Sequence, residues 1–223
     1  MKKESTSLVI VGVGGHALSA WDLALQIGMN VDVFIKPPAY TGKIAKKISD
    51  SNIPVIDYED CQDSLSSPLF LGVGDNFLRS SLLIKFRDLG AEKFPNLISP
   101  SASISHHSSI GHGNFIGNNV SIGPGVDIQN FSILNTKVSV DHENYISDFI
   151  SLSPGTTTGG SVGIGRMTFI GMNSTIRQGL TLGENCLVGA QTYVNNSAPD
   201  NAVLWGNPAR IQYFRKYGES FRI

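Results

Sequence analysis

The sequence predicts a small α/β domain followed by a parallel β-helix, and three observations lead to this prediction. A strand, a glycine turn and a helix-like segment follow one another at the start of the chain. An aliphatic residue then recurs at every sixth position from Ile98 to Val194. The composition changes near residue 97, where helix-like segments give way to this repeat. We therefore expect an α/β domain over residues 1–97, and a β-helix with a C-terminal tail over residues 98–223.

The first domain is expected to open with a β-α-β unit of Rossmann-like type. Residues 8–11 and 31–35 have the apolar runs of buried parallel strands, and residues 17–27 have the apolar period of a helix. Gly14 and Gly15 lie in the turn before that helix, where free backbone N–H groups and the helix dipole favour an anion. The third glycine of the dinucleotide fingerprint is absent, and Lys36 stands where an acid would hold a ribose.

A further strand and glycine turn, at residues 69–74, precede an expected amphipathic helix over residues 78–89. Ligands of open α/β sheets bind at the carboxyl ends of the strands, so the turns at Gly14 and Gly74 are expected to face one pocket. The alternative for Arg79 is a solvated position in the first helical turn. Four polar side chains near these turns are expected to line the pocket: His16, Lys36, Asn76 and Arg79.

The six-residue repeat fits neither a helix nor an ordinary strand. It fits a chain wound so that every sixth side chain enters one interior, with three six-residue edges in each coil of 18 residues. Thr158 interrupts the aliphatic phase. The residue after each aliphatic is often glycine, for which we expect a turn with positive φ. Four residues after the aliphatic, most residues are small or β-branched, which suits a tight corner.

Six motifs span nearly the whole chain: Gly14-Gly15-His16, Gly72-Val73-Gly74-Asp75-Asn76 with Arg79, Leu97-Ile98-Ser99-Pro100-Ser101-Ala102, Leu134-Asn135-Thr136, Val140-Asp141-His142-Glu143 and Gly206-Asn207-Pro208-Ala209-Arg210. Together they resemble the bacterial sugar-nucleotide acetyltransferases of the bacillosamine-pathway and sialic-acid O-acetyltransferase type. The resemblance implies a left-handed β-helix that forms a homotrimer, with acetyl-CoA between neighbouring helices and a nucleotide sugar on the first domain. It implies an N-acetyltransferase acting on a nucleotide-linked amino sugar, such as a 4-amino deoxysugar, for polysaccharide or glycan synthesis. Where that family carries an acid, this chain has Lys36.

Acetyl transfer needs a base for the acceptor's proton and donors for the oxyanion that forms. His142 lies two residues after an inward aliphatic, hence on the outside of a coil, and Glu143 can orient its ring. By resemblance, His142 is the general base and Glu143 its orienting acid. The resemblance also assigns acetyl-CoA contacts to Gly160, Gly189, Ala190, Asn207, Pro208 and Arg210. Substrate contacts are assigned to Gly14, Gly15, His16, Lys36, Gly74, Asn76, Arg79 and Asn135.

The formal charge of −1 is spread without blocks or basic patches, so neither a nucleic acid nor an anionic membrane is expected as a partner. No apolar run is long enough for a signal segment or a membrane span, and a cytoplasmic location is expected.

Three other functions remain open on the sequence alone. The same base would serve a hydroxyl acceptor, so O-acetylation of sialic acid or a related sugar is the alternative enzyme reaction. A non-catalytic β-helical scaffold would have no use for the His142-Glu143 pair. His106 and His142 are two coils apart, as in β-helical γ-type carbonic anhydrases, but Ser147 occupies the third ligand position, and no metal is expected.

Overall fold

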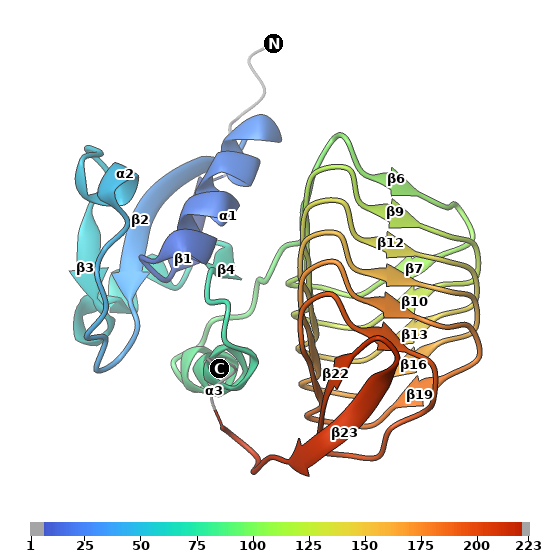
Figure 1. The fold of residues 1–223 in the computed structure, drawn as a ribbon. Helices are drawn as coiled ribbons and strands as arrows, with labels where there is room; N and C mark the ends of the chain where they lie inside the picture. The colour runs from blue at the N-terminus through green and yellow to red at the C-terminus, as the bar shows by residue number, and fades with distance from the viewer. Residues whose placement is uncertain (1–6, 220–223) are drawn as a thin grey trace.

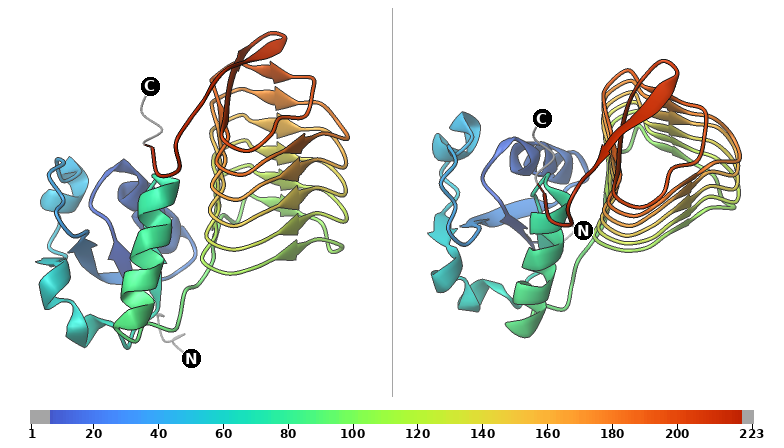
Figure 2. Two further views of the ribbon diagram at one scale, coloured as in Figure 1. Left: turned by 90° about the horizontal axis from the view of Figure 1, so that it is seen from below. Right: turned by 60° about the horizontal axis from the view of Figure 1, so that its bottom comes forward.

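The computed structural model describes residues 7–219 and consists of two parts that lie side by side (Figure 1). The first part is a four-stranded sheet with three α-helices and two short 3₁₀ helices. The second is a stack of three-sided coils closed by a hairpin, and the first part lies along one side of this stack (Figure 2). Within the described residues, no helix is both long enough and apolar enough to cross a membrane.

The sheet of the first part is fully parallel, and its strand order is β3-β2-β1-β4. This is the order in which the first half of a doubly wound sheet is built, and it includes the expected β-α-β unit. Asp75 caps the last helix, since its carboxylate accepts a hydrogen bond from the Leu78 N–H at 2.8 Å. The elements are β1 (Ser7–Val11), α1 (Gly15–Gln26), β2 (Asn30–Lys36), α2 (Lys46–Ser49), β3 (Val55–Asp57), η1 (Tyr58–Asp60), η2 (Gln62–Ser64), β4 (Leu69–Leu71) and α3 (Asn76–Asp88).

The second part is a parallel β-helix of two-residue strands on three faces. Face 1 contains β5 (Leu97–Ile98), β8 (Phe115–Ile116), β11 (Ile133–Leu134), β14 (Ser151–Leu152), β17 (Phe169–Ile170) and β20 (Leu187–Val188). Face 2 contains β6 (Ser103–Ile104), β9 (Ser121–Ile122), β12 (Ser139–Val140), β15 (Thr157–Thr158), β18 (Thr175–Ile176) and β21 (Tyr193–Val194). Face 3 contains β7 (Ser109–Ile110), β10 (Asp127–Ile128), β13 (Tyr145–Ile146), β16 (Gly163–Ile164) and β19 (Thr181–Leu182). The hairpin of β22 (Ala202–Gly206) and β23 (Ala209–Phe214) extends face 1.

The predicted period of 18 residues is confirmed by the strand register. Leu134 pairs with Leu152 and Val140 with Thr158, each one coil apart. The repeated aliphatic residues form one continuous buried core along the stack. Thr158 is 1% exposed and therefore keeps its inward position despite its hydroxyl group. We name the turns by the faces they join: corner 1–2, corner 2–3 and corner 3–1.

The glycines that follow the aliphatic residues have a different cause from the one expected, because they do not have positive φ. A Cβ at Gly165 would lie 2.5 Å from the Gly183 carbonyl carbon, and one at Gly171 would lie 2.6 Å from the Ala190 nitrogen. These glycines thus allow successive turns to stack at coil spacing. The left-handed conformation occurs two residues later, as at Asn119 with φ of 57°.

Bulky side chains at corner 3–1 hold the two parts together. Phe131, Phe149 and Met167 adopt positive φ values of 55°, 57° and 64°, which bulky residues seldom do. All three are buried in one apolar cluster with Leu82 and Phe86 of α3. The burial of these side chains against the first part offsets the backbone strain. The parts before and after the predicted boundary near residue 97 are therefore joined by an extensive apolar contact.

Candidate active site

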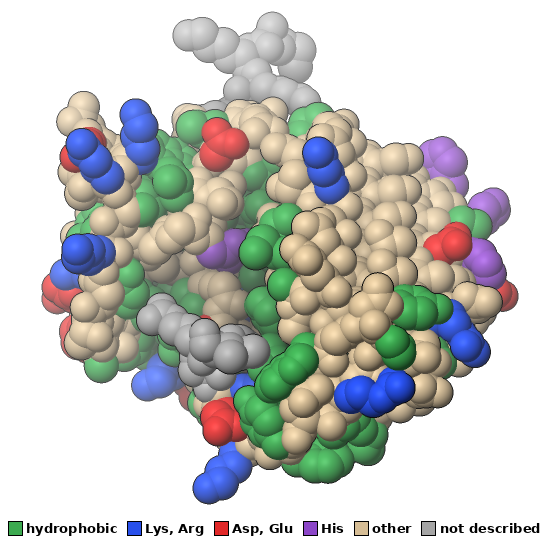
Figure 3. All heavy atoms as spheres, in the orientation of Figure 1, with side chains coloured by type: hydrophobic (Ala, Val, Ile, Leu, Met, Phe, Trp, Pro, Cys, Tyr) green, Lys and Arg blue, Asp and Glu red, His purple; other side chains and the backbone are tan. Residues whose placement is uncertain are grey.

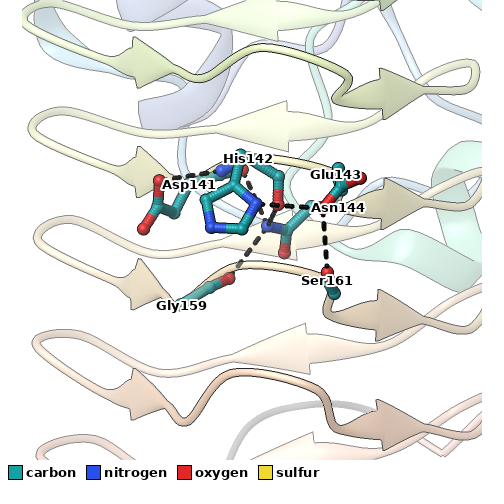
Figure 4. A network of polar contacts seen from close by, with 6 residues as sticks. All are labelled: Asp141, His142, Glu143, Asn144, Gly159 and Ser161. Carbon is teal, nitrogen blue, oxygen red and sulfur yellow. Dashed lines mark hydrogen bonds and ion pairs between the residues drawn. The ribbon is translucent and has the colours of Figure 1, made fainter.

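His142 and Glu143 lie at corner 2–3, and the corner holds them close together (Figure 4). The His142 Nδ1 atom lies 3.1 Å from Glu143 Oε2, and the two side chains are 53% and 69% exposed. Ser161 on the next coil donates a hydrogen bond to the same carboxylate oxygen at 3.3 Å. With Nδ1–H donated to Glu143, Nε2 is left to accept a proton. This geometry suits a general base and the acid that orients it.

A buried amide beneath this turn fixes its backbone. Asn144 is 1% exposed, and its Nδ2 donates hydrogen bonds to the carbonyl oxygens of Asp141, His142 and Gly159 at 2.7, 3.1 and 2.9 Å. Asn144 was not among the residues expected at the site from the sequence. Its signal was an asparagine at an inward corner position where most coils have a small or β-branched residue.

Gly160 lies directly against the imidazole. A Cβ there would lie 2.3 Å from both Cε1 and Nε2 of His142. No side chain other than hydrogen therefore fits while the ring keeps this position. Over residues 7–219, no acceptor contacts the Gly160 N–H, so this donor is available to a ligand beside the imidazole.

A cleft separates the first part from face 1, and its largest cavity has a volume of about 470 Å³. The cavity lies at the carboxyl ends of β1 and β4 and is lined by Gly14, Gly15, His16 and Gly74. Two smaller cavities of about 270 and 370 Å³ continue it along face 1 as far as Asn135 at corner 1–2. The hollow between the two parts is visible in the space-filling view (Figure 3). The structure thus brings these five predicted residues to one cleft.

His16 supplies the cleft with a neutral imidazole. Its Nε2 is buried and, within the part of the chain that the structure describes, has no hydrogen-bond partner. Burial, together with the nearby positive charge of Arg79, lowers the pKa of His16 to about 3. The ring packs against Phe115 with centroids 5.0 Å apart. A buried imidazole nitrogen without a partner is free to bond a ligand in the cleft.

Arg79 does not line the cleft, and neither predicted alternative for it is correct. It is 1% exposed, and its guanidinium donates to the carbonyl oxygens of Phe131 at 2.8 Å and of Val73 at 2.8 Å. Burial lowers the pKa of Arg79 to about 9. Arg79 therefore joins the glycine turn after β4 to corner 3–1 of the β-helix.

Asn76 and Lys36 are also placed outside the cavity wall. Asn76 is fully buried, and its Nδ2 donates to the carbonyl oxygens of Met167 and Thr168 at 3.1 and 3.2 Å. Lys36 is paired with Asp57 on the neighbouring strand, with 2.6 Å between Nζ and Oδ1. The expectation that these two residues line the pocket is corrected, because each side chain is occupied by a partner elsewhere.

The residues expected to bind acetyl-CoA lie on two corners and on the C-terminal hairpin. Arg210 of the hairpin lines a cavity of about 390 Å³ together with residues 195–197 of corner 2–3. This cavity is three coils beyond His142, or about 14 Å along the stack at the usual strand spacing. Gly160 lies between them on the same corner, and the exposed Asn207 and Pro208 form the hairpin loop. Gly189 and Ala190 instead lie at corner 1–2.

The predicted base and the cleft lie on different sides of the β-helix. The cleft borders face 1, whereas His142 is at corner 2–3, the corner that face 1 does not reach. Histidine side chains accordingly appear both in the central hollow and along the far edge of the β-helix (Figure 3). No three His, Cys, Asp or Glu side chains among residues 7–219 are grouped so that they could hold a metal ion.

Residues 93–203 match the protein family described as the GMPPB C-terminal domain. The chain is 42% identical over 57 residues to a putative acetyltransferase, YvoF, of Bacillus subtilis, a match that covers 26% of this chain and 33% of that protein. The match thus spans about a third of the curated relative.

Solved structures match along nearly the whole chain. PerB from Caulobacter crescentus, in complex with CoA and GDP-perosamine, is 31% identical with a TM-score of 0.83, and the match covers 93% of this chain and 97% of that one. Two further structures of that enzyme carry alanine or asparagine in place of one histidine. The acetyltransferase domain of PglB from Neisseria gonorrhoeae, in complex with acetyl coenzyme A, is 26% identical with a TM-score of 0.80, covering 93% and 99% of the two chains.

Proposed function

The chain belongs to the hexapeptide-repeat family of CoA-dependent sugar acetyltransferases, and we propose that it transfers an acetyl group from acetyl-CoA to the amine of a nucleotide-linked amino sugar. The observation that supports this most directly is the cleft of the first part. It joins the N-terminus of α1, where free backbone N–H groups favour a phosphate, to Asn135 of the β-helix. A 4-amino deoxysugar fits the proposal, since perosamine is the amino sugar in the PerB complex.

In the proposed reaction, the diphosphate of the substrate binds the N–H groups of Gly14 and Gly15 at the start of α1. The sugar extends along face 1 toward Asn135. The acceptor amine attacks the thioester carbonyl, and Nε2 of His142 takes the proton that the amine loses. The N–H of Gly160 stabilises the oxyanion. The CoA thiolate then leaves and takes the proton back from His142.

We propose that each active site forms between two chains of a homotrimer. Within one chain, the base at corner 2–3 and the cleft on face 1 do not meet. If corner 2–3 of one chain faces corner 1–2 of its neighbour, His142 comes to the Asn135 end of the neighbour's cleft. The same arrangement unites Gly160 and Arg210 of one chain with Ala190 of the other around one acetyl-CoA. We further propose that the β-helix is left-handed and that the first part is a Rossmann-like domain. We also propose that the protein is cytoplasmic.

The reaction is tested by measuring thiol release from acetyl-CoA with amino sugars linked to UDP, dTDP, GDP and CMP. We expect release with at least one amino sugar and none with the matching hydroxyl sugar. Release with sialic acid or hydroxyl sugars alone would identify an O-acetyltransferase. No release with any acceptor would contradict the proposed function.

The shared site is tested by complementation between two inactive variants. His142→Ala and Asn135→Ala are co-expressed with different affinity tags, and trimers that carry both tags are purified. The purified mixed trimers should recover about a third of wild-type activity, because one of their three interfaces combines an intact His142 with an intact Asn135. Mixed trimers as inactive as the parents would place both residues in the same site of one chain.

A further inference from the structure

The end of the cavity beside β2 differs in chemistry from the rest. With phosphates at the start of α1, the nucleoside of a bound nucleotide passes over the carboxyl end of β2. In dinucleotide-binding sheets, an acidic residue at this position binds the ribose hydroxyls. Here the residue is Lys36, whose Nζ lies 2.6 Å from Oδ1 of Asp57 in an ion pair. The cavity wall at this point consists instead of Pro37 and Tyr40.

The loop around Tyr40 holds its ring in a defined place. The Tyr40 N–H donates to the Pro37 carbonyl oxygen at 3.2 Å, which closes a tight turn, and Ala39 within that turn has a φ of 53°. Such a left-handed conformation is uncommon for alanine. The Tyr40 hydroxyl donates to the Lys43 carbonyl oxygen at 2.9 Å.

The ring also lies beside the glycine turn that begins α1. A Cβ added to Gly14 would be 3.7 Å from the Tyr40 hydroxyl oxygen, which is ordinary contact distance. Since the hydroxyl proton is already donated within the loop, what Tyr40 offers a ligand is its aromatic surface. That surface is half-buried in the cavity wall, next to the expected phosphate position.

We propose that Tyr40 is a stacking platform for the nucleobase of the sugar nucleotide, and that the ribose diol is not held by a carboxylate. This inference rests on the proposed function, since it specifies the nucleoside end of the same cavity. Every base has an aromatic face, so stacking selects weakly among bases. Without an acid for the 2′-hydroxyl, the site accepts ribonucleotides and 2′-deoxyribonucleotides with similar affinity.

Titration calorimetry on the full chain tests the platform with UDP, GDP, their 2′-deoxy counterparts and inorganic pyrophosphate, which has no base. Tyr40→Ala is expected to weaken UDP and GDP binding by about 5- to 150-fold, the usual range for a lost base–aromatic stack. Tyr40→Phe keeps the ring and should bind within about twofold of wild type. Pyrophosphate should bind all three proteins equally. In the wild type, each deoxynucleotide should bind within about threefold of its ribonucleotide.

A second variant displaces the ring without removing it. A Cβ at Gly42 would lie 2.6 Å from the Tyr40 hydroxyl oxygen and 2.7 Å from Cζ, so Gly42→Ala should also weaken nucleotide binding while sparing pyrophosphate. Nucleotide binding that is equal in wild type and Tyr40→Ala would overturn the platform alone. An equal loss of pyrophosphate binding would also overturn the platform. A deoxynucleotide bound more than about tenfold more weakly than its ribonucleotide would overturn the statement that no carboxylate holds the ribose diol. A wild type that binds no nucleotide would overturn the proposed function as well.

Discussion

Replacing Gly160 with alanine is expected to slow turnover strongly while leaving the free energy of unfolding nearly unchanged. The added Cβ would lie 2.3 Å from Nε2 of His142, whereas unstrained contacts are about 3.5 Å or longer. The imidazole must therefore move by about 1 Å, a displacement that costs roughly 100-fold in rate when it affects a reacting group. The His142 side chain is 53% exposed and can swing outward, so we expect a stability cost below about 1 kcal/mol.

The assay compares kcat, KM for acetyl-CoA and urea unfolding for wild type, Gly160→Ala and Gly163→Ala. Gly163 lies on the same coil, and a Cβ there would meet only Thr181 atoms at 3.7 Å, so this control should retain full activity. The double variant Gly160→Ala/His142→Ala should be no slower than His142→Ala, because the glycine acts through the ring. Turnover of Gly160→Ala within about threefold of wild type, or a further large loss in the double variant, would refute this reasoning.

Three other outcomes follow from the same geometry. His142→Ala should reduce turnover by roughly 10²–10⁴-fold with acetyl-CoA affinity little changed. Glu143→Gln should reduce turnover less, because an unoriented imidazole still accepts a proton. Steady-state kinetics measures turnover of both variants, and titration measures their affinity for acetyl-CoA. Arg79→Ala should lower the free energy of unfolding by about 3–5 kcal/mol, since buried carbonyl oxygens lose their donor; a loss below 1 kcal/mol in urea unfolding would contradict the burial. In the unfolded chain His16 has its ordinary pKa of 6.5, whereas in the folded chain its pKa is about 3, so the free energy of unfolding should fall as the pH drops from 6.5 toward 3. His16→Gln should lose about 2 kcal/mol less than wild type between pH 7.5 and 5, and parallel losses would show that His16 is not buried as a neutral group.

The repeat alone determined the β-helix, because only one winding places every sixth side chain in a shared interior. It also located His142, since an outward histidine followed by an acid has no part in that core. The prediction of positive φ at the glycines after the aliphatic residues was wrong. These positions require glycine because the backbone of the next coil, about 18 residues further along the chain, leaves no room for a Cβ. The local sequence shows the glycine but does not show whether a positive φ or a close approach of another segment requires it.

Tertiary structure decided which polar residues of the first part reach the cleft. Arg79 and Asn76 follow a glycine turn, as binding residues often do, but both donate to carbonyl oxygens of corner 3–1, far away in the chain. The contact that fixes them is the apolar docking of α3 onto Phe131 and Phe149, two bulky residues in a conformation that the local sequence does not favour. Sequence patterns specified the coils and the strands β1, β2 and β4, but not β3 or the C-terminal hairpin. The orientation of one part against the other depends on packing between residues that no short motif connects.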